Sequence, residues 1–540
     1  MGGDAGGHEK ALAERGVRKG LGAYYTPPDV VDGLLRMVLD PLLDERAEQG
    51  VGAVASLRVL DPACGTGNFL VAAVERITAT LVELGLDRVE AAGRAVRCVR
   101  GIEIDAATAR ICRANLKAIH PAGGGRSIVR GDALLDENLV PAGTFDVVVG
   151  NPPFLSQLAA STSRSRDDAG RLRTRFGPAV GPYTDPAAVF LLFGLAAARP
   201  TGGVVALVQP VAVLSGRDTR GVRGDALAIA SLAVLWIAEQ PVFDADVEVC
   251  APVLVRGGTA QTTLLVRGRD FRPGPTTNPP SPSAGSWSSL LAALQDLPDR
   301  SLLTDGVVGD IADATADFRD QYYGLAGAVI DQPDGSPVLP RLVTSGLIDP
   351  GRLRWGERTC RFNKTAYRYP RVELRGLTVP MQEWAARRLV PKVLVATQTR
   401  VLEAVVDPEG DVLPSVPVVT VTSRGGREAD LWRIAALLCS PPVTLVAAQR
   451  HLGSARNATA LRLSASDVLA LPLPQDRAAW ERATRSFAAA SGAVDEAAHR
   501  ELLRASARAM DEAYGLIDDD ELLSWWTARL PQAKPVTSDP

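Results

Sequence analysis

The sequence predicts an α/β protein in which a doubly wound parallel sheet is followed by a region of mixed α+β structure. Short apolar, β-branched runs alternate with helical patterns through the first half, which is typical of a doubly wound sheet. A stretch rich in Pro, Gly and Ser, residues 271–289, then indicates an interdomain linker. Since 540 residues exceed what one core holds, we expect two or more domains.

The expected strands of the sheet follow one another with helices between most of them. They lie at residues 57–60, 98–104, 127–129, 145–149, 203–209 and 233–238. We expect residues 251–257 and 261–268 to close the sheet as a hairpin. The predicted organisation is therefore a sheet domain at 1–270, the linker at 271–289, an α+β domain at 290–475 and a helical segment at 476–540.

Composition indicates an ordinary globular protein, with 46% hydrophobic and 22% charged residues. The first residues form no apolar leader, and no apolar run approaches the roughly eighteen residues of a membrane span. We therefore expect a protein that is neither secreted nor inserted in a membrane. The six cysteines show no CxxC spacing, which favours reduced thiols in the cytoplasm over a disulfide framework, a zinc site or any other metal site.

A glycine-containing turn follows the first strand, in 59-VLDPACGTGNFLVAA-73. Glycine lets the backbone turn tightly, and the next helix offers N–H groups and a positive dipole end to a ligand. The dinucleotide fingerprint is not met, because Leu70 takes the third glycine's place and the strand-end acid Glu103 comes 36 residues after Gly67. A single nucleoside, with its ribose held by Glu103, fits this pattern better.

Another buried-strand pattern runs into two prolines, in 145-FDVVVGNPPF-154. Each proline lacks an N–H and fixes its own φ, so the strand is expected to stop at Gly150. Asn151 then lies at the carboxyl end of the strand. In open α/β sheets this edge is where ligands bind.

Together these motifs resemble those of the N6-adenine DNA methyltransferases of the gamma order, found among type I, type II and type IIG modification enzymes. The similar segments, in chain order, are 22-GAYYTPPDVVDGLL-35, 61-DPACGTG-67, 101-GIEID-105, 131-GDALL-135 and 151-NPPF-154. The resemblance covers residues 20–268 motif by motif. It is looser for residues 391–410 and 459–474, which look like parts of target-recognition domains.

The resemblance implies a Rossmann-like sheet that uses S-adenosylmethionine, with a carboxyl-terminal α+β target-recognition domain. The implied activity is methyl transfer to the N6 amino group of a flipped-out adenine in double-stranded DNA, within a restriction-modification or phage-defence system. A separate restriction or specificity subunit is compatible with it. Two alternatives stay open: methylation of RNA adenines or protein glutamines, which also present a planar NH2 group, and a non-catalytic DNA-binding subunit.

The resemblance also implies roles for individual residues. The catalytic group would be Asn151, Pro152, Pro153 and Phe154, with the Asn151 side chain and the Pro152 carbonyl as acceptors and with Phe154 and Phe243 as stacking faces for the base. The cofactor would be held by Tyr25, Thr26, Asp61, Ala63, Gly65, Gly67, Glu103 and Asp132. Asp132 has a plainer interpretation as a turn aspartate after a strand, and Phe154 as a core aromatic.

Basic residues gather in the second half, with twelve Arg or Lys against three Asp or Glu between residues 351 and 400. Arginine neutralises phosphates and positions a protein on DNA without reading sequence. The expected DNA contacts are Arg352, Arg354, Arg358, Arg361, Arg368 and Arg371. A charge-rich solvated face is an alternative explanation of the stretch. Residues 155–188 likewise form either an arginine-bearing loop that orders on DNA or a surface loop.

A fused nuclease of the PD-(D/E)xK type is not indicated. None of the six lysines has Asp or Glu two positions earlier, and the four histidines are scattered. We therefore expect any DNA cleavage to belong to another polypeptide.

Overall fold

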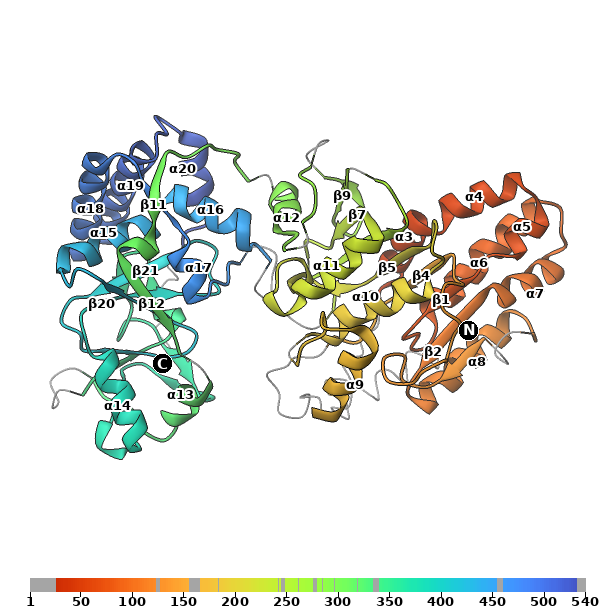
Figure 1. Cartoon of the computed structure of the whole chain (residues 1–540), viewed down its shortest axis with the longest axis horizontal. Coiled ribbons are helices and arrows are strands. Elements are labelled where there is room, and N and C mark those ends of the chain that lie inside the picture. The colour runs from red at the N-terminus through yellow and green to blue at the C-terminus, as the bar shows by residue number, and fades with distance from the viewer. Residues whose placement is uncertain are drawn as a thin grey trace. The chain divides into compact units, whose positions relative to one another are not determined.

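The computed structural model divides the chain into two compact units between residues 296 and 297 (Figure 1). Each unit is considered by itself. The structure describes residues 26–122, 127–154, 166–182, 184–240, 242–243, 248–260, 262–274, 279–283, 285–295, 297–317, 319–333, 339–453 and 460–531.

The first unit is built on a sheet whose central five strands are parallel and run in the order β3-β2-β1-β4-β5. These strands are β1 (Val59–Asp61), β2 (Val99–Glu103), β3 (Ile128–Arg130), β4 (Val147–Gly150) and β5 (Val204–Leu207). The predicted doubly wound α/β fold is therefore confirmed. The strand order reverses between β1 and β4, and such a switch point is where open α/β sheets bind ligands.

Beyond β5, the strands of the sheet do not form the predicted closing hairpin. The strands there are β6 (Gln209–Pro210), β7 (Ala230–Ile237), β8 (Val249–Arg256), β9 (Leu264–Arg267) and β10 (Arg272–Pro273). Strand β8 pairs antiparallel with both β5 and β7, so neither of its edges can pair with β9. After β8 the chain crosses the start of β7, where the Gly257 N–H donates to Ile229 O across 2.9 Å. Strand β9 then pairs in parallel with β7, so β7 lies between the two arms of the expected hairpin.

Helices cover both faces of this sheet, because alternate residues of each strand point to opposite sides. Val147 and Val149 of β4 share a core with helices α3 and α6, whereas Val148 lies under Gly194 of α10. The helices of the unit are α3 (Pro28–Val38), α4 (Asp40–Glu48), α5 (Val51–Ala55), α6 (Asn68–Glu83), α7 (Arg88–Cys98), α8 (Ala106–Ile119), α9 (Arg166–Phe176), α10 (Pro186–Ala197), α11 (Arg220–Ile229) and α12 (Ser288–Leu294).

The second unit combines two four-stranded sheets, ordered β12-β23-β20-β21 and β13-β19-β14-β22, with three two-stranded pairs. Its strands are β11 (Thr304–Val307), β12 (Ala312–Ala316), β13 (Val329–Asp331), β14 (Arg341–Val343), β15 (Ile348–Asp349), β16 (Arg352–Leu353), β17 (Cys360–Phe362), β18 (Thr365–Tyr367), β19 (Pro370–Val372), β20 (Lys392–Ala396), β21 (Glu403–Asp407), β22 (Val412–Pro414), β23 (Val419–Ser423) and β24 (Pro472–Pro474). Its helices are α13 (Arg319–Gly324), α14 (Val379–Arg388), α15 (Glu428–Leu438), α16 (Pro441–His451), α17 (Ala465–Leu469), α18 (Arg477–Gly492), α19 (Glu496–Ala513) and α20 (Asp520–Thr527).

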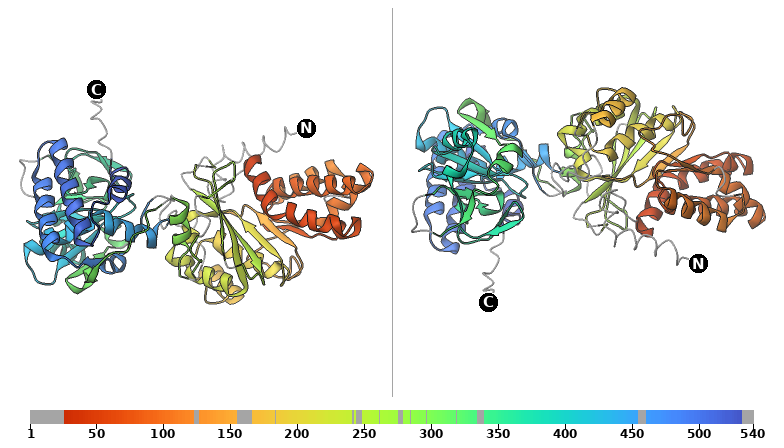
Figure 2. Two further views of the ribbon diagram at one scale, coloured as in Figure 1. Left: turned by 90° about the horizontal axis from the view of Figure 1, so that it is seen from above. Right: turned by 90° about the horizontal axis from the view of Figure 1, so that it is seen from below.

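The unit boundaries differ from those predicted. Strand β10 pairs with β9, and α12 lies in the first unit, so that unit extends past residue 270 and through the predicted linker. The long helices α18 and α19 lie side by side (Figure 2). They are not a separate segment, because β24 pairs with β11 and the Trp480 indole N–H donates to Arg433 O of α15 across 3.1 Å.

Among the described helices, none alone has the length and apolar composition needed to cross a membrane. The helices α15 and α16 meet that criterion only as a pair, across a bend of 62°.

Candidate active site at the carboxyl edge of the sheet

Two buried or half-buried carboxylates stand side by side at the ends of β1 and β2. The Asp61 Oδ1 accepts the Ala63 N–H at 3.0 Å. The Glu103 Oε2 accepts the Gly65 N–H at 2.9 Å, and its Oε1 accepts the Asp105 N–H at 2.8 Å. The turn after β1 is therefore folded onto the carboxylate that ends β2.

The glycines of this turn are required by the backbone. Gly65 and Gly67 have φ of +54° and +96°, a region that favours residues without a Cβ. A Cβ on Gly67 would also lie 2.6 Å from the Cys112 Sγ. Helix α6 begins at Asn68, directly after the turn, so its amino-terminal N–H groups and its positive dipole end lie at this edge of the sheet.

Burial changes the acidity of the two carboxyl groups. It raises the pKa of Asp61 to about 8, and the nearby Glu103 charge adds to this effect while the Ala63 N–H opposes it. Burial also raises the pKa of Glu103, against the hydrogen bonds from Asp105 and Gly65. Two such groups at one sheet edge are suited to a ligand that brings positive charge and hydroxyl or amino donors.

Ile104 is a further residue of this edge that was not predicted from the sequence. Its side chain is 55% exposed although it follows a buried strand and stands between Glu103 and Asp105. An exposed apolar side chain beside polar groups is suited to cover a flat ring. The signal in the sequence is an apolar residue between two acids immediately after a strand.

Asn151 follows β4 at the neighbouring position of the same edge. A Cβ on Gly150 would lie 2.4 Å from the Asp61 Oδ1, so the two strand ends adjoin closely. The Asn151 Nδ2 donates to the Thr26 Oγ1 at 3.0 Å. Thr26 is buried just before α3, so it brings the amino-terminal motif to the Asn-Pro-Pro turn. Tyr25, its predicted companion, lies outside the described residues.

The two aromatic residues expected to stack on a base contact each other. The ring centroids of Phe154 and Phe243 lie 5.8 Å apart with an interplanar angle of 49°, and each residue is 7% exposed. Both belong to the core cluster that includes α3 and α6. A base stacked on both faces requires a separation of roughly 7 Å, twice the optimal carbon–carbon distance. One ring must therefore move to admit a base between them.

Asp132 caps a single helical turn after β3. Its Oδ1 accepts the N–H groups of Leu134 and Leu135 at 2.8 and 3.2 Å. The far end of the turn is held by α9, where the Arg175 Nη1 donates to the carbonyls of Ala133, Leu134 and Asp136 at 3.0, 2.8 and 3.0 Å, and the Arg171 Nη2 to that of Leu135 at 2.9 Å. Asp132 is thus a turn aspartate that follows a strand, as in the plainer of the two interpretations of its sequence position. Within residues 166–176, these two arginines serve the protein's own backbone.

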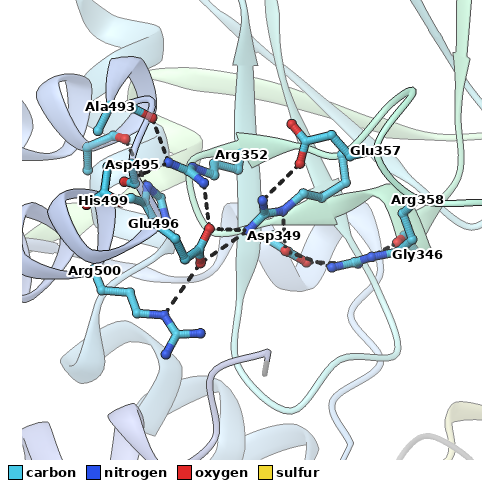
Figure 3. A network of polar contacts seen from close by, with 12 residues as sticks. Gly346, Asp349, Arg352, Glu357, Arg358, Ala493, Asp495, Glu496, His499 and Arg500 are labelled. Atoms are coloured by element: carbon cyan, nitrogen blue, oxygen red, sulfur yellow. Dashed lines mark hydrogen bonds and ion pairs between the residues drawn. The ribbon is translucent and has the colours of Figure 1, made fainter. Parts of the chain in front are cut away.

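Most of the six arginines expected to contact DNA are engaged within the second unit. Figure 3 shows the bonds of Arg352 to Glu496 and of Arg358 to Asp349, which are 2.6 and 2.9 Å long. The Arg354 Nε donates to the same Asp349 carboxylate at 2.7 Å. The side chains of Arg352 and Arg354 are only 12% and 13% exposed.

Arg371 is buried, donates to Gln332 O and lies 4.7 Å above the Trp355 ring. These four residues therefore have partners within the second unit, and their assignment as phosphate contacts stays a prediction. Arg361 and Arg368 are exposed, and the Arg368 Nε donates to Gly356 O at 3.1 Å.

Comparison with known proteins places the first unit in a family. Residues 11–263 match the family model described as N-6 DNA Methylase. The type II methyltransferase M.BstVI of Geobacillus stearothermophilus is 32% identical over 147 residues, which are 25% of each chain. The present chain thus matches a quarter of that relative's length.

Solved structures extend the likeness in fold to both units. The type IIL restriction-modification enzyme MmeI, solved in complex with DNA, is similar with a TM-score of 0.64 and 14% identity, over 95% of this chain and 80% of that one. A nuclease-deletion mutant of the type ISP restriction-modification enzyme LlaGI gives a TM-score of 0.54 and 12% identity, over 87% of this chain and 47% of that one. At these identities the likeness concerns the fold alone. The first unit, through residues 11–263, belongs to the N-6 DNA methylase family.

Proposed function

We propose that this protein transfers a methyl group from S-adenosylmethionine to the N6 amino group of adenine in double-stranded DNA. The observation that carries the proposal is the Asn151 amide, held by Thr26 at the end of β4, beside the two carboxylates that end β1 and β2. This arrangement lies within the residues that match the N-6 DNA methylase model.

The residues at the sheet edge fit S-adenosylmethionine, which carries an ammonium and a sulfonium. Asp61 would face its amino group, Glu103 its ribose hydroxyls, and Ile104 its adenine ring. Thr26 and Tyr25 would lie by the methionine moiety, with Ala63, Gly65 and Gly67 forming the turn and Asp132 near the adenine amine. When bound, the cofactor supplies an electrophilic methyl group. Burial penalises the charged forms of Asp61 and Glu103, which is why their pKa values are raised. A cationic ligand would stabilise the two carboxylates, so the raised pKa values support such a ligand.

The chain's own contribution to catalysis is to make a poor nucleophile better. The lone pair of the adenine N6 is delocalised into the ring. Acceptors aimed at its hydrogens, the Asn151 Oδ1 and the Pro152 carbonyl, would favour a tetrahedral nitrogen and free that pair. Because the Asn151 Nδ2 donates to Thr26, the amide oxygen is turned away from Thr26. Pro152 and Pro153 restrict the backbone that presents both groups.

A base inside a duplex cannot reach this edge, so the adenine must leave the stack. We assign Phe154 and Phe243 to receive it, with the displacement of one ring from the other as part of base entry. As the relatives' names include restriction-modification enzymes, we assign the protein to the modification side of such a system. Cleavage, and any further specificity function, would belong to a separate subunit.

The test is transfer of labelled methyl from S-adenosylmethionine to duplex DNA, bulk RNA and cell protein in parallel. Asn151→Ala is compared with Asn138→Gly, which changes an exposed asparagine whose φ of +61° suits glycine. The expected result is N6-methyladenine in DNA, made by the wild type and Asn138→Gly and lost in Asn151→Ala. Label confined to RNA or protein would overturn the DNA substrate, and label in no substrate despite cofactor binding would favour a non-catalytic subunit.

A further inference from the structure

Only some cations of the basic stretch are left for an external partner. Within residues 339–453, five exposed cations have no hydrogen bond or ion pair to a described residue. One is Arg400, and the other four are Arg361, Lys364, Arg375 and Arg387. Residues near them in sequence build one small core that includes Phe362, Leu377, Met381 and Trp384. Apart from Arg400, the free cations thus lie within, or next in sequence to, β17, β18 and α14.

Two of these cations lie on a tight β-hairpin made by β17 and β18. The register pairs Cys360 with Tyr367, Arg361 with Ala366 and Phe362 with Thr365. Asn363 and Lys364 form its two-residue turn with φ of +46° and +69°, the sign that a type I′ hairpin requires at both positions. Lys364 therefore lies at the tip, and Arg361 lies in the second residue pair behind the turn.

One face of the hairpin is anchored and the other is open. Phe362 is 1% exposed, and its ring centroid lies 4.7 Å from that of Tyr322 in α13. The Tyr322 hydroxyl oxygen also accepts the Asn363 N–H at 2.9 Å, which fixes the turn itself. Arg361 and Ala366 are both exposed and lie directly opposite each other on the other face. The small side chain of Ala366 leaves the guanidinium of Arg361 unobstructed on this face.

We propose that this hairpin enters the major groove of DNA, with Arg361 reading a base edge and Lys364 contacting a phosphate. The major groove is about 12 Å wide and admits a two-stranded β-ribbon. An arginine there pairs in bidentate fashion with the O6 and N7 of guanine, whereas a lysine at the tip neutralises the backbone. The proposal rests on DNA being the substrate, and it adds the element and the residue that select the sequence.

Binding to DNA tests the hairpin independently of catalysis. Fluorescence anisotropy with a short duplex of arbitrary sequence compares Arg361→Ala and Lys364→Ala with Arg504→Ala, which removes an exposed cation of α19 that has no described partner. Lys364→Ala is expected to reduce the dependence of log K on log salt by about one, and Arg504→Ala to leave it unchanged. Equal slopes for Lys364→Ala, Arg504→Ala and the wild type would overturn the phosphate contact.

The base-reading role is tested on the sites that the wild type methylates in its expression host. Arg361→Ala is expected to bind a duplex containing such a site roughly 5- to 150-fold more weakly and to relax the preference at one base pair. Ala366→Glu, which places a carboxylate opposite Arg361 and keeps the arginine, should weaken binding without lowering Tm. An unchanged methylation pattern and unchanged affinity in both variants would overturn the proposal. If the wild type binds DNA through the hairpin but methylates no DNA, the proposed activity is overturned and the proposed role of the hairpin stands.

Discussion

The Thr26 Oγ1 accepts a hydrogen bond from the Asn151 Nδ2 at 3.0 Å, although 125 positions separate the two residues. This bond orients the amide whose oxygen is assigned to the adenine amino group. Thr26→Val keeps the shape but removes the acceptor, so we expect kcat to fall about 3- to 10-fold, in line with one hydrogen bond. Thr26→Ser should retain most of the rate. Single-turnover methylation measures the rates of both variants. Equal rates for Thr26→Val and the wild type would contradict the positioning role of Thr26.

The acidity of Asp61 makes cofactor affinity depend on pH. Its pKa is raised to about 8 in the free protein, so the group is largely protonated at neutral pH. A cationic ligand favours the carboxylate and expels the proton, so affinity should rise up to about tenfold per pH unit as pH rises toward 8 and then level off.

Calorimetry with S-adenosylmethionine, in two buffers of different ionisation enthalpy, measures the released proton directly. Asp61→Asn should bind more weakly at pH 8 and release none. Proton release that is the same in this variant would exclude Asp61 as its source.

The contacts of Arg175 predict a stability difference between neighbouring arginines of α9. Arg175 donates to three backbone carbonyls of the turn after β3, whereas Arg173 is exposed and makes no hydrogen bond or ion pair with a described residue. We expect Arg175→Ala to lower the free energy of unfolding by about 1–3 kcal/mol and Arg173→Ala by less than about 0.5 kcal/mol.

Chemical denaturation of the two variants checks this difference. Hydrogen exchange should in addition show faster opening of the Leu134 and Leu135 amides in Arg175→Ala. Unchanged protection there would mean that Asp132 holds the turn alone.

A buried carboxyl group in the second unit predicts a pH effect on stability. Asp511 is 4% exposed, its Oδ1 has no hydrogen-bond partner among the described residues, and burial raises its pKa to about 8. The pKa of an aspartate in the unfolded chain is near 3.9. Above about pH 4, the folded state therefore holds a proton on Asp511 that the unfolded state has released. Stability should therefore be lost as pH rises from about 4 toward 8.

Asp511→Asn removes this titration and should raise Tm at pH 8 while changing it little at pH 4. The exposed Glu501→Gln serves as a control that should have no such trend. A Tm difference for Asp511→Asn that is the same at both pH values would contradict the account.

Strand-end residues were within reach of sequence reasoning, because a parallel sheet brings the carboxyl ends of its strands to one edge. Asp61, Glu103 and Asn151 were placed there from strand patterns and two prolines, and they lie there. Side-chain exposure was not within reach, so Ile104 was missed. The same holds for the arginines, since Arg352 is neutralised by Glu496, 144 positions later, which no local charge count reveals. The misplaced hairpin has a similar cause, because an insertion of β7 between β8 and β9 leaves both strand patterns unchanged.

The position of β7 in the sheet also sets an order of events during synthesis. Both strands that pair with β7 follow it in the chain, so β7 emerges from the ribosome before either of its partners does. At about 5–20 residues per second, the stretch from Ile237 to the end of β8 at Arg256 takes roughly one to four seconds to translate. Throughout that interval the apolar segment 230-ASLAVLWI-237 is an unpaired strand with high β-propensity. A nascent chain that stalls between β7 and β8 would therefore be a substrate for chaperones or a seed for aggregation.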